Sequence, residues 1–142
     1  LTFTSHIEEN IATFSPLKRL SAGEFAALER AAKAYVSCGA VPCNSCQYCM
    51  PCPYGINIPG IFSFYNENIN EGTYVVSAEQ KDYARTRRKY LLEYNKAIPT
   101  VRQADHCIGC GQCLKKCPQH IRIPNELQRI DRYIEKVKRE TF

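Results

Sequence analysis

Apolar side chains along this chain recur mostly three and four residues apart, the spacing that places them on one face of an α-helix. Three such stripes occur, and the first and third follow a proline that suits the first turn of a helix, Pro59 and Pro124 respectively. The stripes are Ile61, Phe62, Tyr65 and Ile69; Tyr83, Ala84, Tyr90, Leu91, Tyr94 and Ile98; and Leu127, Ile130, Ile134 and Val137. Because no stretch alternates apolar and polar residues as a strand would, the sequence predicts an all-α fold.

The N-terminal part of the chain has the same helical pattern but no cysteine before Cys38. Three helix starts are predicted by capping boxes, in which Ser and a Glu or Gln three residues later bond each other's backbone N–H. The boxes are Ser5 with Glu8, Ser21 with Glu24, and Ser77 with Gln80. The second box precedes an apolar face of Phe25, Leu28, Ala32, Tyr35 and Val36. We therefore expect a helical arm over residues 1–36 and a second helical domain over residues 37–142.

Eight of the nine cysteines form an internal repeat of two runs. The first run contains Cys43, Cys46, Cys49 and Cys52, and the second contains Cys107, Cys110, Cys113 and Cys117. Both runs begin C-x2-C-x2-C and end in Cys-Pro, but the final spacing is x2 in the first run and x3 in the second. The repeat predicts two similar iron–sulfur loops related by a pseudo-twofold axis.

Each run has the spacing of an iron–sulfur loop. In bacterial two-cluster ferredoxins, C-x2-C-x2-C supplies three thiolates to one 4Fe–4S cluster, and the following Cys-Pro ligates the other cluster. We therefore expect two 4Fe–4S clusters with crossed ligands. One site is Cys43, Cys46, Cys49 and Cys117, and the other is Cys107, Cys110, Cys113 and Cys52. The short spacing before Cys52 leaves Cys38 as its alternative.

Zinc and disulfide bonds are the other uses of clustered cysteines. Structural zinc sites use paired C-x2-C knuckles separated by a spacer, whereas each run here is continuous. Disulfide scaffolds spread their cysteines, and the four within residues 43–52 are hard to bridge without strain. The spacing favours iron–sulfur clusters in a reducing, cytoplasmic compartment, with a structural zinc-binding domain as the alternative.

The chain has 142 residues and a formal net charge of +5. Two oxidised clusters, each at about −2 with its four thiolates, would nearly neutralise this charge. No apolar run approaches the ~20 residues of a membrane span, and no base-stacking or groove-reading motif occurs. We therefore expect no membrane partner and no nucleic-acid partner.

Further residues near the cysteines have a functional and a plain interpretation. His106 and His120 either donate hydrogen bonds to sulfur or are ordinary packing residues, and the second interpretation is favoured. Side chains expected to shield the clusters from water are Tyr48, Tyr54, Ile108 and Ile121. A basic run could dock an acidic redox partner protein, but such a run is more often a solvated helix face. It consists of Lys81, Arg85, Arg87, Arg88 and Lys89.

Three segments carry a family resemblance: residues 42–59 (PCNSCQYCMPCPYGINIP), residues 104–121 (ADHCIGCGQCLKKCPQHI) and, more weakly, residues 5–12 (SHIEENIA). The first two resemble the C-terminal 4Fe–4S ferredoxin-type domain of ferredoxin-fused aldo/keto reductases. The third is similar to the last helix of an aldo/keto reductase barrel. The chain begins with Leu1 rather than Met, so we expect it to be part of a longer protein.

The resemblance implies an NADPH-binding aldo/keto reductase barrel upstream, as this domain's partner within an oxidoreductase. The catalytic residues and the NADPH site would belong to that barrel, because none of them falls on this chain. The implied role is electron transfer as the C-terminal module. The alternative is a stand-alone iron–sulfur relay subunit of a larger redox complex.

Overall fold

The computed structural model describes residues 3–142, with the side chains of all of these except Tyr35 and Val36. The predicted positions of those two side chains therefore lie outside the described residues. The chain divides into two compact units, Leu1–Ser37 and Cys38–Phe142. No strand occurs in the described part of the chain, so the predicted all-α fold is confirmed. None of the described helices is long and apolar enough to cross a bilayer.

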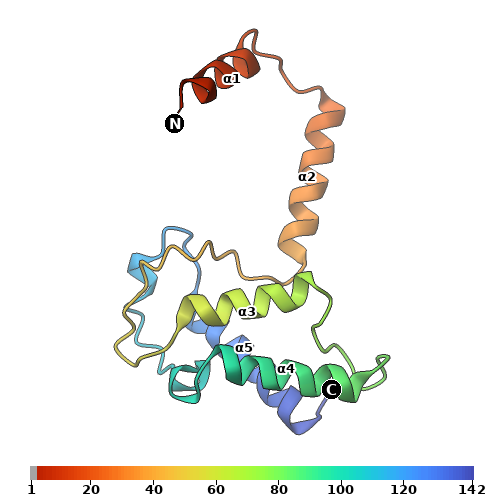
Figure 1. The fold of residues 1–142 in the computed structure, drawn as a ribbon, viewed down its shortest axis with the longest axis vertical. Helices are drawn as coiled ribbons and strands as arrows, with labels where there is room; N and C mark the ends of the chain where they lie inside the picture. The colour runs from red at the N-terminus through yellow and green to blue at the C-terminus, as the bar shows by residue number, and fades with distance from the viewer. Residues whose placement is uncertain (1–2) are drawn as a thin grey trace. The chain divides into compact units, whose positions relative to one another are not determined.

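The first unit contains helix α1 (Thr4–Phe14) and helix α2 (Ala22–Ser37), coloured red and orange in Figure 1. The residue before α1 is Phe3, and no side chain caps this helix. The predicted capping box of Ser5 and Glu8 is therefore wrong. Ser5 already lies in the first turn of α1, where its hydroxyl is past the position of an N-cap.

The capping box at the start of α2 is confirmed. The backbone N–H and the hydroxyl of Ser21 each donate to the Glu24 carboxylate over 2.8 Å, and the Glu24 N–H donates to the Ser21 Oγ over 3.3 Å. These bonds hold the pKa of Glu24 below its usual value, because they favour the ionised carboxylate. The box satisfies two of the N–H groups that a helix start leaves without partners.

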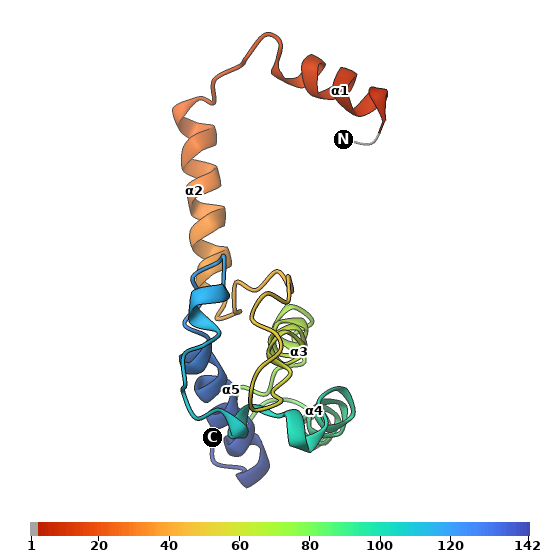
Figure 2. The same ribbon diagram turned by 90° about the vertical axis from the view of Figure 1, so that its left-hand side faces the viewer.

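The second unit is built on helices α3 (Ile58–Asn70), α4 (Tyr83–Ala97) and α5 (Ile123–Arg139), which pack against one another (Figures 1 and 2). Three single 3-10 turns lie in the long connection between α4 and α5. They are η1 (Thr100–Arg102), η2 (Ala104–His106) and η3 (Leu114–Lys116). Since α5 also contacts η2, this last helix ties the connection to the helical core.

Helices α3 and α5 both begin with proline in the first turn, as predicted from Pro59 and Pro124. At α3 the side-chain oxygen of Asn57 also accepts the N–H of Gly60 over 3.2 Å. A Cβ on Gly60 would lie 2.3 Å from the Asn57 amide nitrogen, so this cap requires glycine three residues later.

The predicted box of Ser77 and Gln80 does not start a helix. The Gln80 side chain does accept the N–H groups of Val76 and Ser77, over 2.8 and 3.4 Å. These bonds close a turn instead, and α4 begins only at Tyr83. Asp82 separates the two with a φ of 58°, a left-handed conformation that cannot continue a right-handed helix.

The core of the second unit is formed by the apolar stripes read from the sequence. Side chains with at most 2% of their surface exposed include Ile61, Phe62 and Tyr65 of α3, Tyr90 and Tyr94 of α4, and Leu127, Ile130, Ile134 and Val137 of α5. Burial of one such side chain contributes about 1.5–3 kcal/mol relative to leaving it in water. The core therefore fixes the starts of α3 and α5, and both cysteine loops lead directly into these starts.

Candidate metal centre

The first cysteine loop lines a cavity together with one cysteine from the second run. The empty space there, including the part open to solvent, is about 330 Å³, and the cysteines that line it are Cys43, Cys46, Cys49 and Cys117. The other lining residues include Ile58, Pro59 and Phe62 from the first turns of α3. Three cysteines of one loop and the last cysteine of the other run therefore face the same space.

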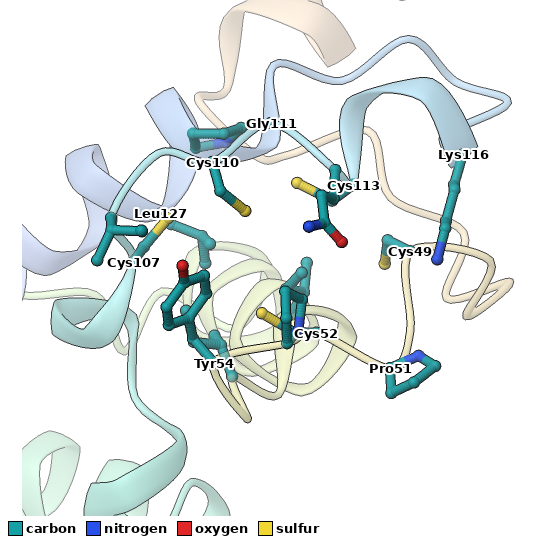
Figure 3. Close-up of a pocket in the computed structure, with 16 residues that line it drawn as sticks. Cys49, Pro51, Cys52, Tyr54, Cys107, Cys110, Gly111, Cys113, Lys116 and Leu127 are labelled. Carbon is teal, nitrogen blue, oxygen red and sulfur yellow. The ribbon is translucent and has the colours of Figure 1, made fainter.

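The second loop lines a similar cavity, where the empty space, including the part open to solvent, is about 400 Å³ (Figure 3). Its cysteines are Cys107, Cys110, Cys113, Cys52 and Cys49. Figure 3 shows the sulfur atoms of the first four around the same space. Pro124 and Leu127 from the start of α5 complete one wall. Cys49 lines both cavities, whereas Cys38 is not among the lining residues of either.

Corresponding cysteines of the two runs are buried to the same degree. The second cysteine of each run, Cys46 and Cys110, is exposed, and the other six are half-buried. All eight carry free thiols. Each run therefore carries four thiols that could act as ligands, and the sequence repeat extends to their exposure to solvent.

The repeat also extends to the backbone of the two loops. In the second loop Gly109 and Gly111 each have a φ of +74°, the left-handed region where glycine is favoured. The first loop has the same conformation at the equivalent positions, where Ser45 has a φ of 56° and Gln47 a φ of 65°. The first loop therefore keeps this path without glycine, at a cost of roughly 1–2 kcal/mol for each of the two residues.

The Cys-Pro turns that end the two runs match in the same way. The N–H of Gly55 donates to the carbonyl of Cys52 over 3.0 Å, and the N–H of His120 donates to the carbonyl of Cys117 over 3.2 Å. Gly55 and His120, with φ of 74° and 52°, both occupy the left-handed region. His120 is thus the structural counterpart of Gly55. The backbone role of His120 in this turn needs no bond from its imidazole to a cysteine.

Hydrogen bonds attach the segment before the second loop to the first loop and to α4. The N–H of Asn57 donates to the carbonyl of Arg102 over 3.0 Å, and Nε of Arg102 donates to the carbonyl of Gly55 over 3.2 Å. Gln103 is buried, and its amide donates to Asn95 and to the carbonyl of Ile98, each over 3.0 Å. The segment before the second loop is therefore fixed both to α4 and to the end of the first loop.

Burial disfavours the thiolate form of the third cysteine of each loop. Burial raises the pKa of Cys49, and the neighbouring Cys43, Cys46 and Cys117 raise it further. Burial raises the pKa of Cys113 in the same way, with Cys107, Cys110 and Cys49 as its neighbours. Nearby positive charge would favour the ionised form of these thiols. The first turns of α3 and α5 supply part of it, because the N-terminal end of a helix carries about +0.5 charge.

A family model described as a 4Fe–4S dicluster domain matches residues 42–122, which include all eight of these cysteines and make up more than half of the chain. The chain belongs to the 4Fe–4S dicluster domain family. Comparison with curated proteins gave no match, and comparison with solved structures gave none either.

The donor sets fit such clusters better than single ions. No three His, Cys, Asp or Glu side chains of residues 3–142 come together as one metal ion requires. A zinc ion needs four ligands at about 2.0–2.3 Å from one point, whereas a cubane takes each thiolate at a different iron. The thiols of this dicluster domain line two mainly apolar cavities without meeting at one point, which suits a group that takes each thiolate at a different iron.

The remaining sequence candidates of the dicluster domain divide into two groups. Tyr54 and Ile108 line the second cavity, and Ile121 is buried beside the first, whereas Tyr48 is exposed and lines neither. His106 bonds the carbonyl of Thr100 over 3.0 Å, which is an ordinary packing role.

Arg87 and Lys89 of the basic run lie on α4 and make separate contacts within the domain. Arg87 is half-buried and donates to the carbonyls of Val137 and Lys138, each over 2.7 Å, while it pairs with Glu140 over 3.1 Å. It therefore caps the C-terminal end of α5. Lys89 pairs with Glu93 over 3.7 Å on the exposed face of α4.

Sequence reasoning missed Lys116, which lines the second cavity. The signal was the extra residue that precedes Cys117 in the second run. The first run has Met50 and Pro51 in the corresponding segment, so comparing the two halves would have singled out this basic insertion.

Proposed function

We propose that this chain passes electrons through two 4Fe–4S clusters with crossed ligands. One cluster is held by Cys43, Cys46, Cys49 and Cys117, and the other by Cys107, Cys110, Cys113 and Cys52. The observation that carries the proposal is the composition of the two cavities. Each contains the three cysteines of one loop and the last cysteine of the opposite run.

A 4Fe–4S cluster supplies a centre that takes up and releases one electron at a time. The residues of this chain hold that centre and limit its contact with water. Ile56, Ile58 and Ile123 are at most 2% exposed and line the cavities from the protein side. The exposed Cys46 and Cys110 lie on the open side of each loop, where an electron can enter or leave.

The first test is the iron and sulfide content of the anaerobically reconstituted chain, followed by EPR after dithionite reduction. About eight irons and eight sulfides per chain, with spin-coupled signals, support two clusters. Stoichiometric zinc without sulfide after the same reconstitution overturns the proposal.

The crossed ligands are tested by comparing Cys52→Ser with Cys38→Ser. Cys52 lines the second cavity beside Cys107 and Cys110, whereas Cys38 lines neither cavity. Cys52→Ser is therefore expected to lose or alter one cluster, and Cys38→Ser to retain both. The reverse result contradicts the assignment of Cys52.

We further propose that the domain is the C-terminal module of an aldo/keto reductase family oxidoreductase linked to NADPH. The sequence likeness of residues 5–12 supports this, as does the exposure of the apolar side chains of the first unit. In α1, Ile7, Ile11 and Phe14 are 46%, 59% and 63% exposed, a row that a further part of the protein would cover. An aldo/keto reductase barrel encoded in frame before Leu1 is the expected result, and a different upstream sequence refutes this part of the proposal.

A further inference from the structure

The two cavities differ in charge although their cysteines and backbones match. The first is lined, besides its cysteines, by neutral side chains only: Asn44, Gln47, Ile58, Pro59, Phe62, Gln119, Ile121 and Ile123. The second is lined by Lys116, and every other residue around it is uncharged. Among the described residues, Lys116 is therefore the one charged side chain that lines either cavity.

The position of Lys116 follows from the longer spacing of the second run. The residues between Cys113 and Cys117 form the turn η3, in which the N–H of Lys116 donates to the carbonyl of Cys113 over 3.2 Å. Figure 3 shows the Lys116 side chain extending along the edge of the cavity on the side of Cys49. Its neighbour Lys115 lines neither cavity.

Among residues 3–142, no carboxylate forms an ion pair with Lys116. Ion pairs in the described part of the chain involve other cations, such as Arg87, Lys89, Arg129 and Lys138. The Lys116 ammonium is exposed, so water and salt screen it in part. It nevertheless adds a full positive charge at the edge of a cavity whose other lining groups are thiols, small polar groups and hydrocarbon.

We infer that Lys116 makes the two clusters unequal, so that the cluster at Cys107, Cys110, Cys113 and Cys52 is reduced first. This inference rests on the proposed function. Reduction brings one electron from an external reductant, adds one negative charge to the cluster and transfers no atom. A positive charge nearby stabilises the reduced form more than the oxidised form, which raises the reduction potential. The first cavity has no charged side chain among its lining residues, so its cluster would gain less of this stabilisation and would donate electrons to its neighbour.

The size of the effect follows from Coulomb's law. A unit charge near a protein surface, at an effective dielectric constant of about 20, changes the equilibrium constant for reduction about tenfold at roughly 10 Å. For a one-electron couple this corresponds to about 59 mV. We expect a smaller effect on the first cluster, because Lys116 lines the second cavity and not the first.

The experiment is a potentiometric titration of the reconstituted full chain, followed by EPR, with dithionite as reductant. The chain is compared with Lys116→Gln, with the charge-conserving Lys116→Arg, and with the matched control Lys115→Gln. Two reduction steps are expected in the unmodified chain. In Lys116→Gln, the equilibrium constant for reduction in the higher-potential step should fall about tenfold. The potentials of the two steps should therefore move closer together. Lys116→Arg and Lys115→Gln should leave the separation of the two steps nearly unchanged. Raised salt should reduce the separation in every chain that keeps a positive charge at position 116, and change it little in Lys116→Gln.

The outcomes separate this inference from the proposed function. Full iron and sulfide loading with identical titrations for Lys116→Gln and Lys115→Gln overturns the role of Lys116 and leaves the two clusters in place. Equal shifts of both steps also overturn it, as does a shift in Lys116→Arg as large as in Lys116→Gln. Failure of the unmodified chain to bind iron and sulfide overturns the proposed function itself.

Discussion

The matching turns at Gly55 and His120 offer a direct test of the structural repeat. Both residues have a left-handed backbone, and both N–H groups donate to the carbonyl of the cysteine three residues earlier. The two positions differ in sequence, because one has glycine and the other a residue that carries a Cβ. Substitution of each by alanine should therefore give different results although the turns are the same.

The magnitudes follow from the backbone alone. A Cβ on Gly55 would meet only the carbonyl oxygen of Val101, at an ordinary 3.9 Å, so no clash adds to the cost. Alanine in a left-handed conformation costs roughly 1–2 kcal/mol, and the smaller entropy of the unfolded chain returns about 0.4–1 kcal/mol. Gly55→Ala should thus destabilise the domain by about 1 kcal/mol. His120→Ala should change little, because His120 already bears the backbone strain and its side chain is exposed.

The assay is thermal unfolding of the iron-loaded full chain under anaerobic conditions, followed by circular dichroism. For a domain of about 100 residues, 1 kcal/mol lowers the midpoint by about 4–8 °C. His120→Gly is the third variant, and it should raise the midpoint because it relieves the strain. Equal losses for Gly55→Ala and His120→Ala would refute the reasoning, because they would show that the two positions do not share a left-handed backbone.

Three further predictions concern the helical core and the metal. Arg87→Ala should cost about 2–4 kcal/mol of unfolding free energy, because it removes two charge-assisted hydrogen bonds to the end of α5. The control Arg88→Ala, at an exposed position, should cost at most about 0.5 kcal/mol. Equal losses for the two variants in urea denaturation contradict the capping role of Arg87. Tyr133→Phe should cost about 1–3 kcal/mol, because it leaves the buried N–H of Val75 without its 2.9 Å acceptor. Tyr90→Phe should be neutral or stabilising, because no partner for the buried Tyr90 hydroxyl occurs among the described residues. A larger loss of stability in Tyr90→Phe than in Tyr133→Phe, measured by the same urea denaturation, contradicts this prediction. Anaerobic removal of iron by a chelator should abolish most of the helical signal of the second unit, because cluster binding and folding are coupled, and unchanged circular dichroism disproves that coupling.

The helices of the second unit could be predicted because their patterns are local and redundant. The stripe after Pro124 repeats an apolar residue at three- and four-residue intervals over about three turns, and α5 buries Leu127, Ile130 and Ile134 as that spacing requires. The family of the domain was equally accessible, because the order and spacing of thiolates are fixed by the cluster and not by the fold.

Single-residue features were less predictable, because several conformations satisfy the same local sequence. Ser77 and Gln80 have the spacing of a capping box, and their side chains do bond the nearby backbone. The same bonds are compatible with a turn, and the left-handed Asp82 decides between the two. Likewise, Ser45 and Gln47 give no indication of a positive φ, because only glycine signals that region in a sequence. Their conformation follows from the position of the cysteines on either side.

The repeat is symmetric in its ligands and in its backbone, but asymmetric in the spacer before the last cysteine. The first run crosses this interval with Met50 and Pro51, whereas the second has one residue more and forms the turn η3. That extra residue places a lysine where the first run has none. Two identical centres would share an electron equally. A preferred direction of electron transfer between them requires a difference in reduction potential, which four cysteines at each centre do not provide. Under the proposed function, the lysine that this spacer adds is a difference in charge between the two cavities, which would set the direction of transfer without altering either set of cysteines.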